Sequence, residues 1–317
     1  MTKKSQIQKA VLSFLAGEGN LGTLIKGRFS RTGTIECDRK PVFIKICTDP
    51  RRVPRMENEY SWLKRIDRVS PCLVPRPFAL MPLRQPGVEC VLAIEAIDGL
   101  SLEILLEDRN ANHAELLEKY GQLVARFHDL PFASDSLVFD GQTWPDWKSY
   151  VVGALNGYLD DIRRLGGSLP PGIERRMRIV IQSSLSAPDL PKMQVVHGDP
   201  SPNNAFVESS GSLRFLDLEL TQCGDPMLDF ASLGVFEFGN KPGDWPSFLR
   251  GYGRSMTEGE RRRIALCRLL RIVRFMRGQL WMYRDLAGFE ERVTDLETVV
   301  IHLEDKRCPD PRPLWLP

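Results

Sequence analysis

Five polar residues in one short part of the chain have the types and spacing that phosphate chemistry uses. His197, Asp199 and Asn204 belong to the run HGDPSPNN, and Asp217 and Glu219 belong to the run LDLE that follows. In phosphoryl transfer, one such group orients the acceptor hydroxyl while an Asn/Asp pair holds magnesium on the nucleotide phosphates. These residues therefore predict phosphoryl transfer to a hydroxyl group.

The chain between these two runs predicts a β-hairpin. The apolar stretches AFV and LRFL flank the turn-forming sequence SSGS, which is the pattern of two short strands and a tight turn. A register centred on this turn pairs Phe206 with Phe215 and Asn204 with Asp217. Opposed side chains on one face of a hairpin lie about 5 Å apart. We therefore expect Asn204 and Asp217 to share one divalent metal ion, with Asp199 arriving from the loop before them.

A lysine and a glutamate in the amino-terminal part of the chain are expected to form an ion pair. Lys45 lies in the apolar run VFIKIC, which predicts a strand and by itself indicates an exposed lysine on a sheet edge. The helix that follows has an inward stripe at i, i+3, i+7 and i+10 spacing: Met56, Glu59, Leu63 and Ile66. A carboxylate on an apolar face needs a partner, and Lys45 is the natural candidate for Glu59.

The order of these motifs resembles that of a known protein family. The set consists of HGD, an asparagine five residues after its aspartate, a strand ending in Asp-x-Glu, and the run GDPMLD that contains Asp225 and Asp229. It is similar to the motif set of the aminoglycoside phosphotransferase and choline kinase family, a small-molecule branch of the protein-kinase-like fold. The match is dense over residues 195–233 and traceable over about residues 27–130.

The resemblance implies a fold and its division into lobes. The fold is a two-lobed α+β protein-kinase-like fold, in which an antiparallel sheet with one key helix forms the N-terminal lobe and the C-terminal lobe is mainly helical. We expect the nucleotide-binding lobe at residues 1–94, a hinge at 95–99, and the catalytic and acceptor-binding lobe at 100–317.

The resemblance also implies a role for each central residue. Asp199 orients or deprotonates the acceptor hydroxyl, and Asn204 and Asp217 hold magnesium. Lys45, fixed by Glu59, contacts the nucleotide phosphates. The expected cofactors are therefore ATP (or GTP) and Mg²⁺.

Further nucleotide contacts are expected from backbone groups. Residues 27–33 would form the loop over the phosphates and end in a turn, SRTG, with the N–H groups of Ser30 and Gly33 as donors. Backbone groups from Glu95 to Ile97 would meet the adenine. The loop has no clean GxGxxG pattern, and the chain contains no GxxxxGK[ST] run, which argues against a Walker-type site.

Several polar residues near these are expected to support the site rather than react. The resemblance gives His197 the role of bracing the catalytic loop through hydrogen bonds, and Glu219 either joins the magnesium shell or supports it. Asp225 and Asp229 are interpreted as a turn and a helix-start anchor rather than as metal ligands. His128 is interpreted as a packed structural histidine.

The acceptor is expected to be a small molecule with a hydroxyl group. Only seven residues separate Asp217 from Asp225, which is too few for the activation segment of a protein kinase. The resemblance favours an aminoglycoside or related antibiotic. The alternatives are choline, an amino alcohol, a sugar amine or a biosynthetic intermediate, and, from a different class, a nucleotide-binding protein without activity. A cationic acceptor would meet clustered carboxylates: Glu103, Glu107, Asp108, Glu219 and Glu237.

Two further groups of side chains have both a structural and a functional interpretation. The aromatic residues Trp144, Trp147 and Tyr150 are interpreted as core, with a wall of the acceptor pocket as the alternative. The capping box TEGE opens a long arginine-rich helix. Its arginines are expected on the solvated side, with an anionic acceptor site as the alternative: Arg261, Arg268, Arg271 and Arg274.

Composition is that of an ordinary soluble globular protein, with 42% hydrophobic and 26% charged residues and a formal charge of +2. This charge predicts no nucleic-acid partner. No apolar run reaches the ~20 residues that span a bilayer, so no membrane partner is expected, and the short apolar run after residue 9 is interpreted as an amphipathic helix rather than a signal peptide. Seven cysteines without a CxxC pair favour free thiols. We therefore expect a cytoplasmic protein, either a monomer or a homodimer.

Overall fold

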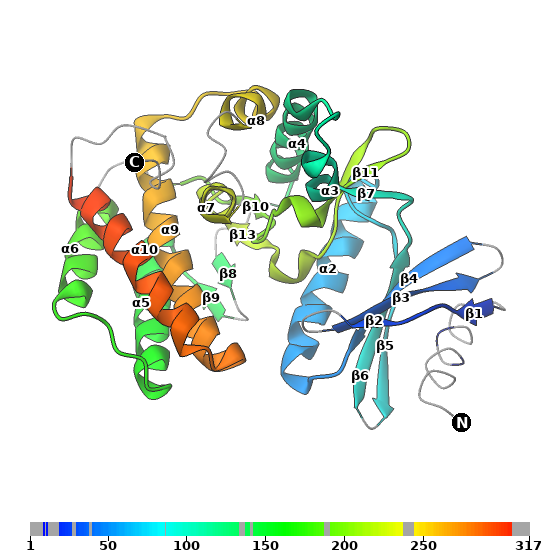
Figure 1. Cartoon of the computed structure of the whole chain (residues 1–317), viewed down its shortest axis with the longest axis horizontal. Helices are drawn as coiled ribbons and strands as arrows, with labels where there is room; N and C mark the ends of the chain where they lie inside the picture. The colour runs from blue at the N-terminus through cyan, green and yellow to red at the C-terminus, as the bar shows by residue number, and fades with distance from the viewer. Residues whose placement is uncertain are drawn as a thin grey trace. The chain divides into compact units, whose positions relative to one another are not determined.

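The computed structural model divides the chain into two compact units, whose elements are drawn in Figure 1. The first unit comprises Met1–Asn112 and Pro202–Thr221, and the second comprises His113–Ser201 and Gln222–Pro317. The structure describes residues 9, 11, 19–26, 30–37, 40–85, 87–132, 137–139, 142–186, 191–236 and 244–305. The HGD run thus belongs to the second unit and the hairpin after it to the first. The lobe limits expected from the sequence remain a prediction.

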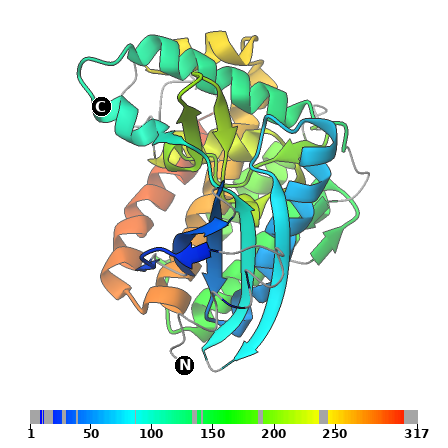
Figure 2. The same ribbon diagram turned by 90° about the vertical axis from the view of Figure 1, so that its right-hand side faces the viewer.

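A six-stranded antiparallel sheet, visible in blue and cyan in Figure 2, dominates the first unit. Its order is β1-β3-β4-β6-β5, with β2 paired to β3. The strands are β1 (Gly19–Leu21), β2 (Ile25–Lys26), β3 (Ser30–Cys37), β4 (Lys40–Cys47), β5 (Pro77–Gln85) and β6 (Val88–Glu95). Alternate residues of a strand point to opposite faces, so Val42, Ile44 and Ile46 of β4 are buried together in the core. Lys45 points to the other face, which is covered by α2 (Val53–Val69).

One turn predicted in this sheet is wrong. The run SRTG lies inside β3, where Ser30 pairs with Cys47 and Gly33 pairs with Ile44 of β4. Cross-strand pairing with β4 outweighs the turn preference of the local sequence. Residues 27–29, the first part of the expected phosphate loop, lie outside the described residues.

Helix α2 presents the predicted stripe to the sheet. It follows a 3-10 turn (Pro50–Arg52) in which Asp49 Oδ1 accepts a hydrogen bond from the Arg51 N–H at 3.0 Å. The buried residues of α2 are Met56, Glu59, Trp62, Leu63 and Ile66. The inward orientation of Glu59 is therefore confirmed, and Trp62 is an additional core residue between two predicted ones.

The hairpin after the HGD run is present, but its predicted register is wrong by one residue. β11 (Ala205–Glu208) and β12 (Leu213–Phe215) pair Ala205 with Phe215. The loop between them contains Gly211 with a φ of 83°. A left-handed glycine at this place is typical of three-residue hairpin loops. An odd number of loop residues shifts the register by one relative to the symmetric turn expected from SSGS.

The corrected register changes the residue that lies opposite Asn204. The carbonyl oxygen of Asn204 accepts the N–H of Leu216 at 2.7 Å, so Leu216 rather than Asp217 lies beside it. Asp217 has left strand geometry altogether, with a φ of 57° and a ψ of 62° at the start of η3 (Leu218–Leu220). The direct opposition of Asn204 and Asp217 is therefore wrong.

A third strand, β7 (Gly99–Ser101), pairs with β11 and gives the order β12-β11-β7. A Cβ atom on Gly99 would lie 2.3 Å from the backbone oxygen of Val207, so only glycine permits this approach. The short helix α3 (Leu102–Glu107) follows directly, with Ser101 Oγ accepting the Ile104 N–H at 3.4 Å.

We expect Gly99→Ala to lower the free energy of unfolding by about 1–3 kcal/mol, because the methyl group must push two backbones apart. Denaturant-induced unfolding measures this effect. The matched control is Gly157→Ala in α5 (Trp147–Arg164), where an added methyl group has nothing within 4 Å and alanine favours the helix. Equal stability of the two variants would contradict the close approach of β7 to β11.

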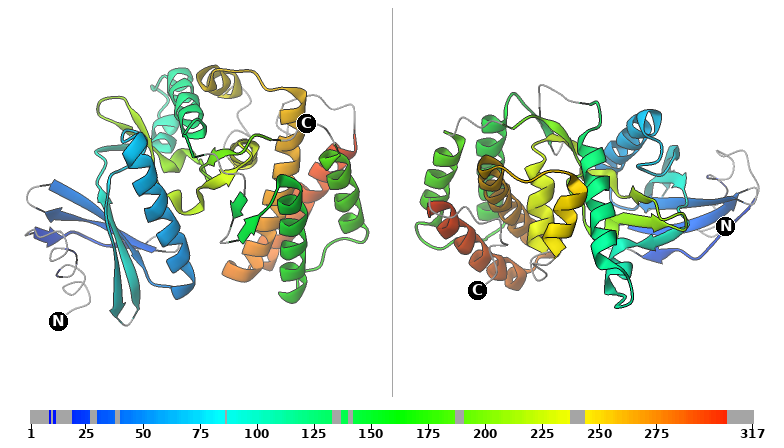
Figure 3. Two further views of the ribbon diagram at one scale, coloured as in Figure 1. Left: turned by 180° about the vertical axis from the view of Figure 1, so that it is seen from behind. Right: turned by 90° about the horizontal axis from the view of Figure 1, so that it is seen from above.

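The second unit is built from helices around α9 (Glu258–Gly278), which contacts α5, α7 and α10. Figure 3 shows α9 and α10 in orange and red beside the green helices α5 and α6. The other helical elements described in this unit are α4 (His113–His128), α6 (Ile173–Leu185), α7 (Met227–Phe236), α8 (Asp244–Tyr252), the π-helical turn η4 (Gln279–Tyr283) and α10 (Leu286–Glu304). Its strands form two pairs, β8 (Leu137–Phe139) with β9 (Gln142–Trp144) and β10 (Gln194–Val196) with β13 (Gln222–Gly224). The 3-10 turn η2 (Pro202–Asn204) belongs to the first unit.

The capping box predicted at the start of α9 is confirmed. The side chains of Thr257 and Glu260 each accept a hydrogen bond from the other residue's backbone N–H.

These elements confirm the predicted fold class, an α+β protein-kinase-like fold with one antiparallel sheet, one key helix and a mainly helical second part. No helix within the described residues combines the length and the apolarity that a bilayer crossing requires.

Candidate active site

Lys45 is the centre of a charged cluster in the first unit. Its Nζ donates to Glu59 Oε2 at 2.8 Å and to Asp217 Oδ1 at 2.7 Å, and lies 3.7 Å from Glu219 Oε2. Strand β4 supplies the lysine, α2 supplies Glu59, and the segment after β12 supplies the other two carboxylates. The ion pair expected between Lys45 and Glu59 is therefore present, and Asp217 binds the same ammonium group.

Burial and the neighbouring carboxylates act in opposite directions on the pKa of Lys45. Burial by itself lowers this pKa, but Glu59, Asp217 and Glu219 together outweigh burial and raise it. The lysine therefore stays protonated. Burial also raises the pKa of Glu59, while the Lys45 ammonium group opposes that shift. The cluster thus keeps a permanent positive charge between carboxylates.

Asp217 and Glu219 have different surroundings although only one residue separates them. The Asp217 side chain is 41% exposed, and its left-handed backbone is one that aspartate tolerates. Glu219 is held by arginines: Arg52 Nη2 lies 2.7 and 2.6 Å from its two carboxylate oxygens, and Arg55 Nη1 lies 3.5 Å away. Asp217 is therefore the more accessible of the two carboxylates.

The start of α2 is attached to the segment that contains these carboxylates. Besides the arginine contacts, Asn58 Nδ2 donates to the backbone oxygens of Glu219 at 3.2 Å and Thr221 at 3.0 Å. Sequence analysis missed this attachment. The sequence feature that could have predicted this attachment is the three-residue spacing of Arg52, Arg55 and Asn58, which places their side chains along one face of the first turns of α2.

Asp229 fixes the backbone of the HGD loop in the second unit. Its carboxylate accepts hydrogen bonds from the N–H groups of His197 at 2.7 Å and Gly198 at 2.8 Å, and lies 3.0 Å from His128 Nε2. Burial by itself raises the pKa of Asp229, but the hydrogen bond and charge of His128 and the contacts with His197 outweigh it and lower the pKa overall. Asp229 is therefore an ionised anchor of the loop.

His128 is a packed residue, as predicted. It is 2% exposed, and its Nδ1 lies 2.9 Å from the hydroxyl group of Tyr252 on α8 while its Nε2 faces Asp229. Both ring nitrogens thus have partners inside the second unit, and the ring is inaccessible to a substrate.

His197 and Asp199 lie on the same loop but differ in exposure. His197 is completely buried, and its Nδ1 accepts the backbone N–H of Asp199 at 3.3 Å. The side chain of Asp199 is 42% exposed, and its Oδ1 accepts a hydrogen bond from Arg271 Nη2 at 3.0 Å. Gly198 between them has a φ of 81°, a conformation that favours glycine. The loop therefore buries the histidine and exposes the aspartate.

Asp225 has structural partners. It is fully buried, accepts the Met227 N–H at 3.0 Å where α7 begins, and pairs with Arg263 of α9 at 2.9 Å. Burial raises the pKa of Asp225, and Arg263 opposes that shift. These contacts join the start of α7 to α9.

The arginines of α9 do not form the solvated surface that the sequence predicted. Arg268 is 4% exposed, and burial lowers the pKa of its guanidinium group to about 9. Arg271 contacts the HGD loop, and Arg261 and Arg274 are partly buried. The prediction is wrong because neighbouring helices pack on several sides of α9, a property that its own sequence does not reveal.

The aromatic residues Trp147 and Tyr150 of α5 belong to the core, as predicted, while Trp144 before the helix is partly buried. Trp147 and Tyr150 are buried, and their ring centroids lie 5.3 Å apart. The ring of Trp144 lies so close to Gly153 that a Cβ atom there would be 2.1 Å from it.

Glu95 ends β6 and has partners of its own. Its Oε2 accepts from Arg214 Nη1 at 2.9 Å and from the backbone N–H of Arg76 at 3.1 Å. Ile97 follows it and is partly buried. The Glu95 side chain thus connects the end of the sheet to the hairpin, a contact that the sequence did not predict.

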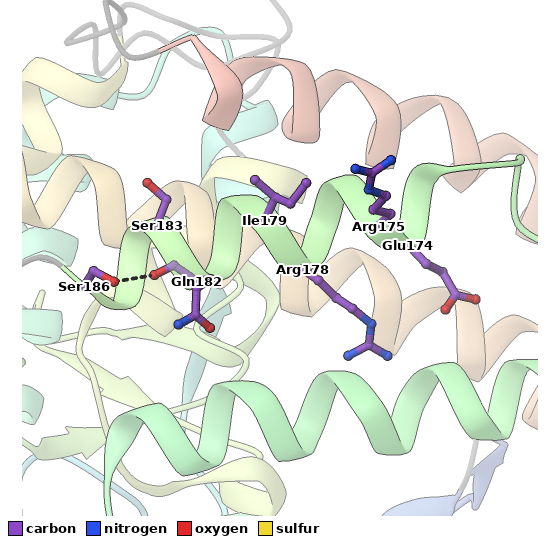
Figure 4. Close-up of a pocket in the computed structure, with 7 residues that line it drawn as sticks. All are labelled: Glu174, Arg175, Arg178, Ile179, Gln182, Ser183 and Ser186. Atoms are coloured by element: carbon purple, nitrogen blue, oxygen red, sulfur yellow. Dashed lines mark hydrogen bonds between the residues drawn. The ribbon is translucent and has the colours of Figure 1, made fainter.

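An open hollow on the second unit lies over α6 and contains none of the predicted site residues (Figure 4). In Figure 4 its side chains point to either side of α6. Its lining is Glu174, Arg175, Arg178, Ile179, Gln182, Ser183 and Ser186. The hollow has no group suited to phosphate chemistry beyond two surface arginines.

The fold and these residues define the chain as a small-molecule phosphotransferase of the protein-kinase-like fold. A model of the phosphotransferase enzyme family, APH, matches residues 29–267, which is more than half of the chain. The chain belongs to this family. A search of curated proteins finds no significant match.

Solved structures of similar fold include three informative ones. A thermostable variant of aminoglycoside phosphotransferase APH(4)-Ia, in ternary complex with AMP-PNP and hygromycin B, has a TM-score of 0.70 at 14% identity and covers 95% of this chain and 99% of its own. The GDP complex of a variant of aminoglycoside 2'-phosphotransferase-IIIa has 0.67 at 11%, covering 96% and 99%. A choline/ethanolamine kinase family protein from Mesorhizobium loti has 0.64 at 17%, covering 96% and 95%.

Proposed function

We propose that this phosphotransferase moves the γ-phosphoryl group of ATP, or of GTP, to a hydroxyl group of a small molecule in the presence of Mg²⁺. The observation that supports this most strongly is the Lys45 ammonium group, which binds Glu59 at 2.8 Å and Asp217 at 2.7 Å. A lysine fixed by a glutamate, beside a metal-binding aspartate, is how kinases hold nucleotide phosphates. Structures of similar fold contain AMP-PNP or GDP, which supports a nucleoside triphosphate as donor.

Asn204 and Asp217 are the proposed ligands of Mg²⁺. Their oxygen atoms are the hard donors that this ion prefers, and Mg²⁺ needs only one or two protein carboxylates because phosphates and water complete its shell. In the described part of the chain, no group of three or more His, Cys, Asp or Glu side chains could hold a metal by itself, which fits such a shared site. Glu219 is proposed to support the shell, since Arg52 holds both of its oxygens. The ion would neutralise charge on the β- and γ-phosphates.

Asp199 is the proposed catalytic residue, which orients the acceptor hydroxyl and accepts its proton. Its exposed side chain on an anchored loop supports this role. His197 and Asp229 are proposed to position that loop, and Asp225 to position α7. The backbone N–H groups of Ser30 and Gly33 are the proposed donors to the nucleotide phosphates, and backbone groups of Glu95 and Ile97 are the proposed contacts of the adenine.

An aminoglycoside or related antibiotic is the proposed acceptor, because structures of similar fold include one with hygromycin B. Choline, an amino alcohol, a sugar amine or a biosynthetic intermediate is the alternative, supported by the choline/ethanolamine kinase family neighbour. Glu103, Glu107 and Asp108 lie in or just after α3 and remain candidates for contacting a cation; Glu237 lies outside the described residues. We further propose a cytoplasmic location and a monomer or homodimer.

The experiment that tests this function incubates the protein with Mg-ATP and a panel of aminoglycosides, choline, ethanolamine and amino sugars. Mass spectrometry should find a phosphorylated acceptor and an equal amount of ADP, both of which disappear when EDTA removes Mg²⁺. Replacing ATP with GTP identifies the donor. Tight ATP binding without product from any acceptor would favour the alternative of a nucleotide-binding protein without activity.

We expect Arg52→Gln to raise the KM for Mg-ATP about tenfold, which corresponds to about 1.4 kcal/mol, because Glu219 and the segment after Asp217 lose their attachment to α2. Initial-rate kinetics measure this change. Arg51→Gln is the matched control, since the Arg51 side chain is 67% exposed and bonds to Asp49, which is two residues away in the sequence. The same KM in both variants would show that the Arg52 contact does not position the nucleotide site.

A further inference from the structure

One arginine of α9 contacts the HGD loop at two points. Arg271 Nη1 donates to the backbone oxygen of Gly198 at 2.7 Å, and Nη2 donates to Asp199 Oδ1 at 3.0 Å. The residues come from segments 72 positions apart, yet all belong to the second unit. A single planar guanidinium group therefore links the backbone of the loop to the carboxylate that the loop exposes.

The exposure of the two side chains and the geometry of the guanidinium group indicate that Arg271 holds Asp199 in a fixed orientation. The Arg271 side chain is 18% exposed against 42% for Asp199, so the arginine is the buried partner and the aspartate the accessible one. A guanidinium group presents its donors in a rigid fork, and two bonds from one fork define a direction that a single bond does not. The angle of the Asp199 carboxylate relative to its own backbone is thereby restricted.

A second arginine of the same helix holds the other side of this loop. Arg263 of α9 binds Asp225 at the start of α7, and Asp229 of α7 binds the backbone N–H groups of His197 and Gly198. Helix α9 therefore reaches the loop directly through Arg271 and indirectly through α7. The loop is held at its N–H groups from one side and at a carbonyl and a carboxylate from the other.

We propose that Arg271 is a positioning residue for phosphoryl transfer, which sets the orientation of the Asp199 carboxylate toward the acceptor hydroxyl. This inference rests on the proposed function of Asp199. In a loose phosphoryl-transfer transition state, the hydroxyl needs alignment more than a strong base, and misplacement by about 1 Å can lower a rate about 100-fold. Arg271 supplies that alignment from a helix far away in the sequence. The loop itself has no cation at the corresponding place, because Ser201 occupies the position of the lysine found in Asp-x-Lys loops of protein kinases.

The test compares Arg271→Gln and Arg271→Lys with Arg277→Gln. Arg277 is the matched control because it also lies on α9 and pairs with an aspartate, Asp161, at 2.5 Å, away from the loop. With the acceptor identified by the panel above, Arg271→Gln should lower kcat about 100-fold with the KM for ATP within twofold. The kcat of Arg271→Lys should lie between those of Arg271→Gln and wild type, because an ammonium group can bind one of the two partners but cannot hold both in a fixed geometry.

Three results would overturn the proposal: a kcat of Arg271→Gln within threefold of wild type, an equal loss in Arg277→Gln, or a rise confined to the acceptor KM, which would make Arg271 an acceptor-binding residue. If Arg271→Gln fails to fold, the lysine variant decides: a kcat below that of wild type with an unchanged KM for ATP supports the proposal, and a kcat equal to that of wild type overturns it. The rate of hydrogen exchange at the backbone amides of residues 197–201 tests the positioning role of Arg271 without any measurement of activity. Faster exchange in Arg271→Gln than in Arg277→Gln supports positioning even when no acceptor of the panel reacts, and unchanged exchange contradicts it.

Discussion

Asp199→Asn is expected to lower kcat by about 10²- to 10⁴-fold, the usual contribution of a positioned acid–base group. The substitution keeps the shape of the side chain and an oxygen that can face Arg271, but removes the charge that accepts the hydroxyl proton. Because the Lys45 cluster belongs to the other unit of the chain, nucleotide affinity should change less than threefold. Steady-state kinetics with the identified acceptor and calorimetric binding of Mg-ADP measure the two effects separately.

Asp160→Asn provides the control for this prediction. Asp160 is 75% exposed and pairs with Arg163 one turn away on α5, so its kinetics should match those of the wild type. If Asp199→Asn retained a kcat within threefold of wild type, another group would have to orient the acceptor, and the mechanism proposed for this loop would be lost.

Asp229→Asn is expected to lower the free energy of unfolding by about 1–3 kcal/mol, the usual cost of leaving a buried hydrogen-bonding group without its partner. The carboxylate accepts from two backbone N–H groups and faces His128, and an amide cannot accept at all three places because one of its two polar atoms is a donor. Urea-induced unfolding followed by circular dichroism measures the loss. Activity should fall with stability, since the HGD loop loses its anchor.

The pH dependence of stability gives an independent check on Asp229. Its pKa is lowered in the folded chain, so its contribution is present above the unfolded pKa of about 3.9 and is lost as the pH falls through the folded pKa. Asp229→Asn should therefore lose less stability than wild type on acidification below about pH 4. Asp295→Asn, at an exposed site on α10 paired with Arg292, should behave like wild type. Identical acid sensitivity in the Asp229 variant would contradict its ionised, anchoring state.

Periodicity explains why one half of the candidate site was predictable from the sequence. The stripe of α2 placed a carboxylate on an apolar face, and burial of such a group demands a cation, so Glu59 led to Lys45 without knowledge of the fold. The fold class was predictable by a different route, because the order of HGD, the following Asn and Asp-x-Glu resembles the motif set of a known family. His128 and the aromatic residues of α5 were recognised as core from helical spacing alone.

Other features of the site depended on geometry that spacing does not encode. The register of the hairpin turned on whether Gly211 adds a residue to the loop, and a one-residue change reverses the faces of both strands. The contacts of Arg52 with Glu219 and of Arg271 with Asp199 join segments far apart in the sequence. An arginine on a helix has the same local sequence whether it faces solvent or a neighbouring loop, so the burial of Arg268 was also not predictable.

Transfer of an isotopic label tests the central claim most directly. ATP labelled with oxygen-18 in its γ-phosphoryl group is incubated with the protein, Mg²⁺ and the acceptor identified by the panel, and the product is analysed by mass spectrometry. Phosphoryl transfer to the acceptor hydroxyl predicts that the labelled phosphoryl group appears intact on the acceptor, and that Asp199→Asn slows its appearance by at least 100-fold. Label found only in inorganic phosphate, or appearing on the acceptor at an unchanged rate in the variant, would contradict the account.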